Sequence, residues 1–151
     1  MIYFDSSALV KRYLKEDGTE VVKSIITTDK MIATSKLTYP EMLSAFMRKF
    51  RAKEMGRKHL QVVIDKFETD WFHLIVIELH DELLRTGKGL LEKYPLRAAD
   101  TVHLSSALWL ELNTKAKLTF VTSDESLIKA ARAEKLRVAN PLQGEFSSDE
   151  K

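Results

Sequence analysis

The sequence contains no cysteine, which excludes disulfide bonds, a thiolate zinc site, a CxxC redox pair and a cysteine nucleophile. Glycine is also scarce, and none of the five glycines belongs to a GxGxxG or GxxxxGK[ST] motif, so the common nucleotide-binding loops are excluded. No apolar run reaches the roughly 18 residues of a membrane span, and the first residues lack the pattern of an export signal. We therefore expect a cytoplasmic protein without membrane contact.

The length and composition fit one globular domain. Of the 151 residues, 44% are hydrophobic and 30% are charged, which is enough to enclose a core. The net charge is only +2, so the total charge does not mark the protein as a nucleic-acid binder. We expect one domain over residues 1–142 and a disordered tail over residues 143–151, because the tail is polar and charged.

Short apolar segments alternate with helical patterns along the chain. Strands are predicted at residues 2–4, 31–33, 72–77 and 118–121, with a fifth candidate at 138–139. Apolar stripes over 43–50 and 60–71 predict two helices that pack as a hairpin around Gly56, and further helices are expected from Ala98 and over 125–135. This alternation predicts an α/β fold with a parallel sheet covered on both faces.

Two aspartates follow predicted strands, where ligands bind in such folds. Asp5 comes directly after residues 2–4, and Asp124 comes shortly after residues 118–121. Each can also serve only as a helix N-cap, and Thr122 with Glu125 matches a capping box. The sequence leaves both interpretations open.

Asp100 lies on the inward stripe of its predicted helix, in line with His103 and Leu104. A position in the first turn of a helix contributes only about 0.3–1 kcal/mol, so a buried carboxylate there needs a cation or several hydrogen bonds. The alternative is that Asp100 only satisfies the N-terminus of that helix. Glu41 is more ambiguous, because Thr38 and Glu41 fit a capping box with Pro40 at an early helix position.

Four carboxylates at one sheet edge repel one another unless they share protons or bind a divalent cation. Oxygen ligands without thiolates favour Mg²⁺ or Mn²⁺ over zinc. Such ions activate water and stabilise the leaving oxygen in phosphodiester hydrolysis. Metal-dependent hydrolysis of nucleic acid is therefore the chemistry that the acidic residues indicate.

The segments that carry these acids stand in a recognisable order: YFDSSALVK at 3–11, TYPEMLSA at 38–45, LRAADTVHL at 96–104 and FVTSD at 120–124. Together they resemble the PIN-domain nucleases, most closely the small VapC-type toxins of prokaryotic toxin–antitoxin pairs. The resemblance implies a three-layer α/β/α sandwich and an Mg²⁺ or Mn²⁺ site formed by Asp5, Glu41, Asp100 and Asp124. It also implies an endoribonuclease that cleaves single-stranded RNA, forms homodimers and is held inactive by a small antitoxin protein.

Several polar residues are candidates for substrate binding. Ser6 and either Thr122 or Ser123 match hydroxyl positions of the family. Lys11 and Arg12, with Lys15, and the basic stretch 48–59 can either follow an RNA backbone or form solvated helix faces. Arg97 can orient Asp100, contact a phosphate or form a surface salt bridge, whereas His103 is expected to pack inside the fold.

Two rival functions remain. One is a catalytically silent PIN-like domain that binds RNA or protein, and the other is a housekeeping RNA-processing nuclease. Intact acids at all four positions argue against the silent domain, because a polyanion docks poorly on crowded carboxylates. Haloacid-dehalogenase chemistry is excluded because it needs a second Asp two residues after the first, where this chain has Ser7.

Overall fold

The computed structural model describes residues 1–29 and 31–144. Five parallel strands form one sheet in the order β3-β2-β1-β4-β5. They are β1 (Ile2–Phe4), β2 (Ile32–Ser35), β3 (Ile75–Ile77), β4 (Thr119–Val121) and β5 (Arg137–Ala139). Phe4 of β1 pairs with Val121 of β4, so the residues that follow these central strands leave the sheet side by side.

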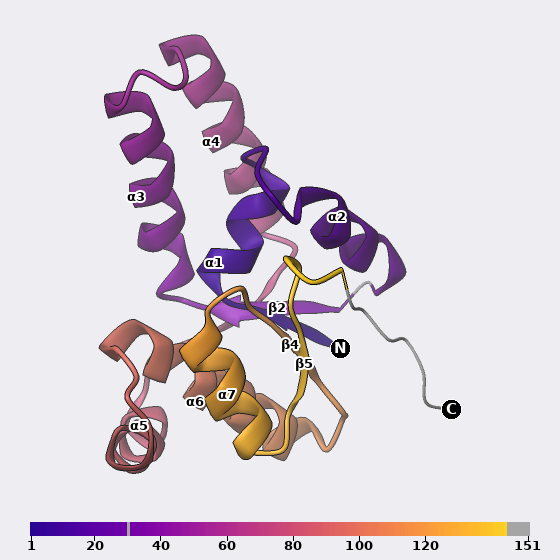
Figure 1. Ribbon diagram of the computed structural model, residues 1–151, viewed down its shortest axis with the longest axis vertical. Helices are drawn as coiled ribbons and strands as arrows, with labels where there is room; N and C mark the ends of the chain where they lie inside the picture. The colour runs from indigo at the N-terminus through magenta and orange to yellow at the C-terminus, as the bar shows by residue number, and fades with distance from the viewer. Residues whose placement is uncertain (30, 145–151) are drawn as a thin grey trace.

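Helices cover both faces of the sheet, which confirms the expected α/β/α sandwich (Figure 1). One layer contains α1 (Ser6–Leu9), the 3-10 turn η1 (Val10–Arg12), α2 (Thr19–Thr28), α3 (Thr38–Arg51) and α4 (Arg57–Trp71). The other contains α5 (Asp81–Lys93), α6 (Ala98–Thr114) and α7 (Glu125–Ala133). Among the described residues, no helix is both long and apolar enough to cross a membrane.

The short central strand β1 serves both cores. Ile2 and Phe4 join the core with α1 to α4, whereas Tyr3 joins the core with α5 to α7. All three side chains are buried because a strand inside a doubly covered sheet has no solvent face. This explains why the strand segments are apolar throughout rather than alternating.

The predicted hairpin of helices is confirmed, since α3 and α4 pack against each other and extend away from the sheet (Figure 1). The prediction of a strand over residues 72–77 is wrong for its first three residues. The apolar stripe of α4 continues to Trp71, so Phe72 caps that helix and is 83% exposed, and β3 begins only at Ile75.

Two helices were not expected from the sequence, namely α2 and α5. In α5, Gly87 allows close contact with α6, because a Cβ atom at this position would lie 2.9 Å from Cγ2 of Thr101. Glycine lowers the helix propensity of α5, so packing against α6 and not local preference stabilises this segment.

The C-terminal boundary stays an expectation. Gln143 is described, and its backbone N–H donates a hydrogen bond to the carbonyl oxygen of Asn140 at 3.1 Å. The remainder of the predicted tail, residues 145–151, lies outside the described residues.

An ion pair joins the end of α4 to η1. Nε of Arg12 donates to Oδ2 of Asp70 at 2.8 Å, and the hydroxyl of Tyr13 donates to the same oxygen at 2.9 Å. Burial by itself would raise the pKa of Asp70, but the hydrogen bonds from Arg12 and Tyr13 and the charges of Arg12 and Lys66 lower the pKa below its usual value. The folded state therefore favours the ionised carboxylate.

We predict that Asp70→Asn destabilises the protein by about 1–2 kcal/mol at neutral pH, because two hydrogen bonds to a charged acceptor are weakened. The difference from wild type should shrink as the pH falls below the ordinary aspartate range, where the wild-type carboxylate becomes protonated. Urea unfolding at several pH values measures this, with Asp65→Asn on the exposed face of α4 as the control. A difference that stays constant down to strongly acidic pH would contradict the assignment.

Candidate active site

Asp5 lies at the junction of β1 and α1 and is only 3% exposed. Its Oδ1 accepts a hydrogen bond from the backbone N–H of Ala8 at 2.9 Å, and its Oδ2 accepts one from Oγ1 of Thr122 at 2.7 Å. The hydroxyl of Ser7 lies 2.9 Å from both oxygens. Asp5 is thus the N-cap of α1 and also a buried carboxylate at the carboxyl edge of the sheet, so the capping interpretation is confirmed and the binding role stays a prediction.

Burial raises the pKa of Asp5 above its usual value. The nearby His103 and the hydrogen bonds from Thr122, Ala8 and Ser7 act in the opposite direction and lower the pKa, but they do not outweigh burial. An added cation would favour the ionised carboxylate, because an opposite charge at short range stabilises the charged form.

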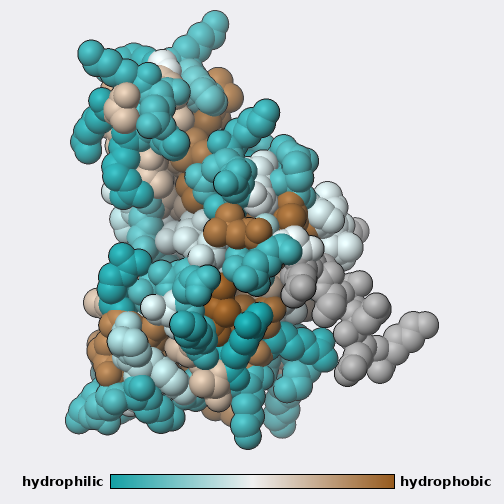
Figure 2. All heavy atoms as spheres, in the orientation of Figure 1, coloured by the Kyte–Doolittle hydropathy of each residue, from teal (hydrophilic) through white to brown (hydrophobic). Residues whose placement is uncertain are grey.

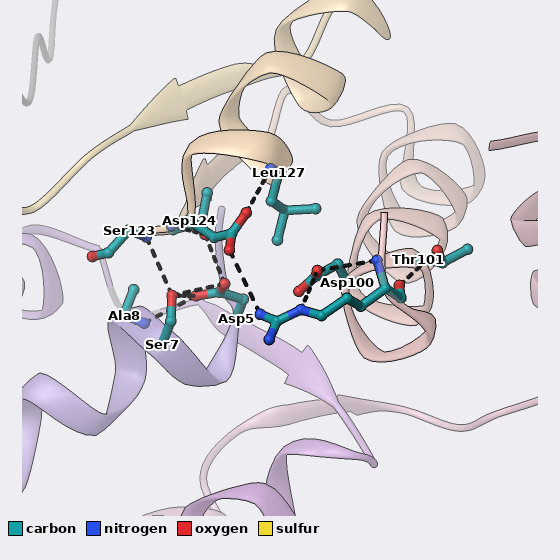
Figure 3. Close-up of polar contacts among 10 residues, drawn as sticks. Asp5, Ser7, Ala8, Asp100, Thr101, Ser123, Asp124 and Leu127 are labelled. Atoms are coloured by element: carbon teal, nitrogen blue, oxygen red, sulfur yellow. Dashed lines mark hydrogen bonds and ion pairs between the residues drawn. The ribbon is translucent and has the colours of Figure 1, made fainter. Parts of the chain in front are cut away.

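Asp100 and Asp124 reach the same space from the first turn of α6 and from the N-terminus of α7 (Figure 3). Oδ1 of Asp124 accepts a hydrogen bond from the backbone N–H of Leu127 at 2.8 Å, which makes Asp124 the N-cap of α7. The predicted capping box that starts at Thr122 does not form, because the N-cap is two residues later.

Arg97 joins these two aspartates. Its Nε lies 3.3 Å from Oδ2 of Asp100, and its Nη2 lies 3.7 Å from Oδ2 of Asp124. The hydrogen bond to Asp100 raises the pKa of Arg97, and the charges of Asp100, Asp124 and Glu41 raise it further. The arginine side chain is 81% exposed, so it covers the carboxylates from the solvent side.

Glu41 is held by a histidine and not by a helix cap. Its Oε1 lies 2.7 Å from Nε2 of His103, whose Nδ1 lies 3.1 Å from the hydroxyl of Tyr3. The capping-box interpretation of Glu41 is wrong, because Leu37 occupies the N-cap of α3 and Oγ1 of Thr38 instead contacts Oγ1 of Thr34 at 2.7 Å.

His103 packs in the interior as expected, with 2% exposure, yet it also connects the sheet to an acidic residue. Sequence reasoning missed the link from Tyr3 through His103 to Glu41, because its members are far apart in the chain. The available signal was the spacing of Asp100 and His103, which places both on one face of α6.

The hydroxyl residues near Asp5 differ in their contacts. Thr122 donates to Asp5 through Oγ1, which also accepts from the N–H of Asp124 at 3.1 Å, and Oγ of Ser7 accepts from the N–H of Ser123 at 3.2 Å. Oγ of Ser123 is buried without a hydrogen-bond partner among the described residues. Ser7 was not among the predicted site residues, whereas the predicted Ser6 lines a cavity that Glu41 also lines.

The two basic candidates on the segment after Asp5 have other partners. Lys11 is buried and pairs with Glu16 at 2.8 Å, and Arg12 pairs with Asp70. The third basic candidate of this segment, Lys15, is exposed and lies beyond the end of η1. None of the contacts described for Lys11 or Arg12 involves the four acidic residues, whereas Arg97 contacts two of them.

Across residues 1–29 and 31–144, no three His, Asp or Glu side chains form a ready-made metal site. The donor chemistry nevertheless fits Mg²⁺ or Mn²⁺, which prefer carboxylate oxygens. The buried Asp5 would gain from a nearby cation, and Arg97 already provides a positive charge between Asp100 and Asp124. Asp5, Glu41, Asp100 and Asp124 are the residues that could hold such an ion.

Two relatives with similar sequences are both named VapC ribonucleases. Ribonuclease VapC45 of Mycobacterium tuberculosis is 30% identical over 108 residues, which cover 72% of this chain and 75% of the relative. Ribonuclease VapC46 of the same species is 27% identical over 141 residues, which cover 93% of this chain and 97% of the relative.

Solved structures share the fold at lower identity. The FitAcB structure from Neisseria gonorrhoeae superposes with a TM-score of 0.70 at 16% identity, covering 93% of this chain and 98% of that one. VapBC2 from Rickettsia felis, bound to a DNA fragment from its promoter, gives 0.62 at 18% identity with the same coverage. The model of the PIN domain family matches residues 2–133, a span that contains β1 to β4, all the helices and all four acidic residues. With this match over most of its length, the chain belongs to the PIN domain family.

Proposed function

We propose that this protein is a metal-dependent endoribonuclease that cleaves single-stranded RNA in the cytoplasm as the toxin of a prokaryotic toxin–antitoxin pair. The observation that carries the proposal is the gathering of Asp5, Asp100 and Asp124 at the carboxyl edge of β1 and β4 (Figure 3). The VapC relatives, which are named ribonucleases, supply the nature of the substrate.

Asp5, Glu41, Asp100 and Asp124 would hold Mg²⁺ or Mn²⁺. A bound divalent ion supplies positive charge to the scissile phosphate and makes water a better nucleophile at neutral pH. Thr122 and Ser7 fix the orientation of the Asp5 carboxylate through hydrogen bonds. Tyr3 orients His103, which in turn fixes Glu41, so the acidic residues are positioned before any ligand arrives.

A small antitoxin and a second copy of the chain are the proposed protein partners. Support for an antitoxin comes from the fold neighbours, which include a toxin–antitoxin complex from Klebsiella pneumoniae with a TM-score of 0.65 at 14% identity. The exposed leucines of α5, Leu84 and Leu91, offer apolar surface for a protein partner.

Arg97 has the role of an internal counterion in this proposal. Its guanidinium lies between two carboxylates that would otherwise repel each other, and it is exposed enough to move away. The same positive charge opposes the entry of a metal cation into that space. Arg97 therefore stabilises the metal-free protein and weakens metal binding.

We predict that Asp5→Asn and Asp100→Asn each lower metal-dependent RNA cleavage by more than about 100-fold, because each removes a charged ligand. The measurement is cleavage of a mixed RNA substrate with Mn²⁺, Mg²⁺ or excess chelator. Asp65→Asn, which removes an exposed carboxylate on α4, should cleave as wild type does. Full activity of Asp100→Asn would rule out the proposed metal site.

We predict that Arg97→Gln binds Mn²⁺ about fivefold more tightly than wild type and unfolds at a lower temperature without metal, because a positive charge between carboxylates is lost. Calorimetric titration with Mn²⁺ alone and thermal unfolding with chelator measure the two effects. Arg85→Gln removes an exposed charge on α5 and should change neither. Weaker Mn²⁺ binding by Arg97→Gln would show that the arginine positions the ligands instead.

A further inference from the structure

A cavity of about 430 Å³ opens beside the acidic residues, between α1 and the first turns of α3. Glu41, Ser6 and Ser7 line the end nearest the candidate active site, and Ser7 also contacts Asp5. Ser44 and Arg48 line the same cavity farther along α3. The cavity therefore adjoins the acidic residues through Glu41, which lines it, and through Ser7, which joins it to Asp5.

The lining residues of α3 follow one face of the helix. Glu41, Ser44 and Arg48 are spaced i, i+3 and i+7, which places them in one row along the helix. A separation of seven residues corresponds to about 10 Å along an α-helix. This offset from Glu41 places Arg48 where it can contact a phosphate that neighbours the one being cleaved.

The charge of Arg48 has no carboxylate partner among the described residues. Its side-chain contact is a long one, with Nη1 at 3.5 Å from Oγ of Ser44. The adjacent Lys49, in contrast, pairs with Glu54 at 2.6 Å. Of the basic stretch 48–59, Arg48 alone lines this cavity, whereas the far end of the α3–α4 hairpin forms a hydrophilic tip (Figure 2).

An acidic centre repels a nucleic-acid backbone, so affinity for RNA must come from positive charge beside it. Arg12, Lys11 and Arg97 are already paired with carboxylates, and the first two have no contact with the acidic centre. Arg48 combines an available charge with a place in the cavity that leads away from Glu41. Ser6 and Ser44 add hydroxyl groups that can bond to phosphate or ribose oxygens.

We propose that this cavity binds the stretch of single-stranded RNA next to the scissile phosphate, and that Arg48 contacts one specific backbone phosphate there. The inference rests on the proposed nuclease function and adds a substrate subsite to it. It also gives a path for the RNA, which runs from the acidic residues along α3. Arg48 is a substrate-binding residue in this arrangement and takes no part in the chemical step.

The test pairs a variant of Arg48 with a change in a single phosphate. A single-stranded RNA that the wild type cleaves is prepared with one neutral methylphosphonate at each position in turn. Binding is measured by fluorescence anisotropy with chelator for wild type, Arg48→Gln and Arg48→Lys. Arg51→Gln is the matched control, because it removes one exposed charge from the same helix outside the cavity.

We expect Arg48→Gln to weaken binding about five- to tenfold and to lower the salt dependence of log K by about 0.7, the value for one phosphate contact in a single strand. Neutralising one particular phosphate should weaken wild-type binding equally and have no further effect in Arg48→Gln. Arg48→Lys should recover part of the affinity because it keeps the charge.

Two results would overturn the assignment. If Arg48→Gln bound the RNA as Arg51→Gln does, or if every methylphosphonate had the same effect in wild type and Arg48→Gln, this cavity would not be the subsite. Failure of the wild type to bind or cleave any single-stranded RNA would instead overturn the nuclease function itself. The two failures are therefore distinguishable.

Discussion

The buried carboxylate of Asp5 connects the two central strands at the edge where the candidate active site lies. It accepts a hydrogen bond from Thr122, just after β4, while its own backbone N–H donates to the carbonyl of Val121 at 3.2 Å. It also caps α1 through Ala8. Because burial raises the pKa of Asp5, the fold keeps a carboxylate in a place that costs free energy unless a positive charge is near. Either protonation of Asp5 or a nearby cation would relieve this cost.

The other three acidic residues have partners on two sides, one open to solvent and one buried. Arg97 lies at the solvent side, where it contacts Asp100 and Asp124 but can leave, and His103 lies inside, where it fixes Glu41. The proposed RNA substrate must bring a phosphate close to carboxylates that repel it. The positive charges of Arg97 at the acidic residues and of Arg48 in the adjoining cavity would reduce that repulsion. The His103 contact is buried and the Arg97 contact is open to solvent, an arrangement that fits the proposed binding of metal and substrate.

Helix capping and a position at the sheet edge coincide for two of the four acidic residues. Asp5 and Asp124 are N-caps because parallel strands lead directly into helices, and the same geometry places both at the edge where ligands bind. A helix N-terminus also favours a carboxylate electrostatically, by about 0.3–1 kcal/mol. Helix capping therefore helps to hold Asp5 and Asp124 in place. A residue can cap a helix and lie at the sheet edge at once, so the sequence could not separate a capping role from a binding role.

The sequence by itself determined the α/β class and the hairpin of α3 and α4, because periodicity is a local property. It also placed Asp5 and Asp124 after central strands, because a strand–helix junction is local too, whereas the joint role of the four acidic residues stays a prediction. It did not determine α5, whose glycine-containing segment is stabilised by contact with α6, or the start of β3, where the helical stripe of α4 extends to Trp71.

Only the tertiary structure decided that Glu41 binds His103 instead of capping α3, that Lys11 and Arg12 have partners elsewhere, and that Arg48 reaches the cavity. These contacts join residues up to 62 positions apart, and such distances are closed by the packing of helices on the sheet and not by local pattern.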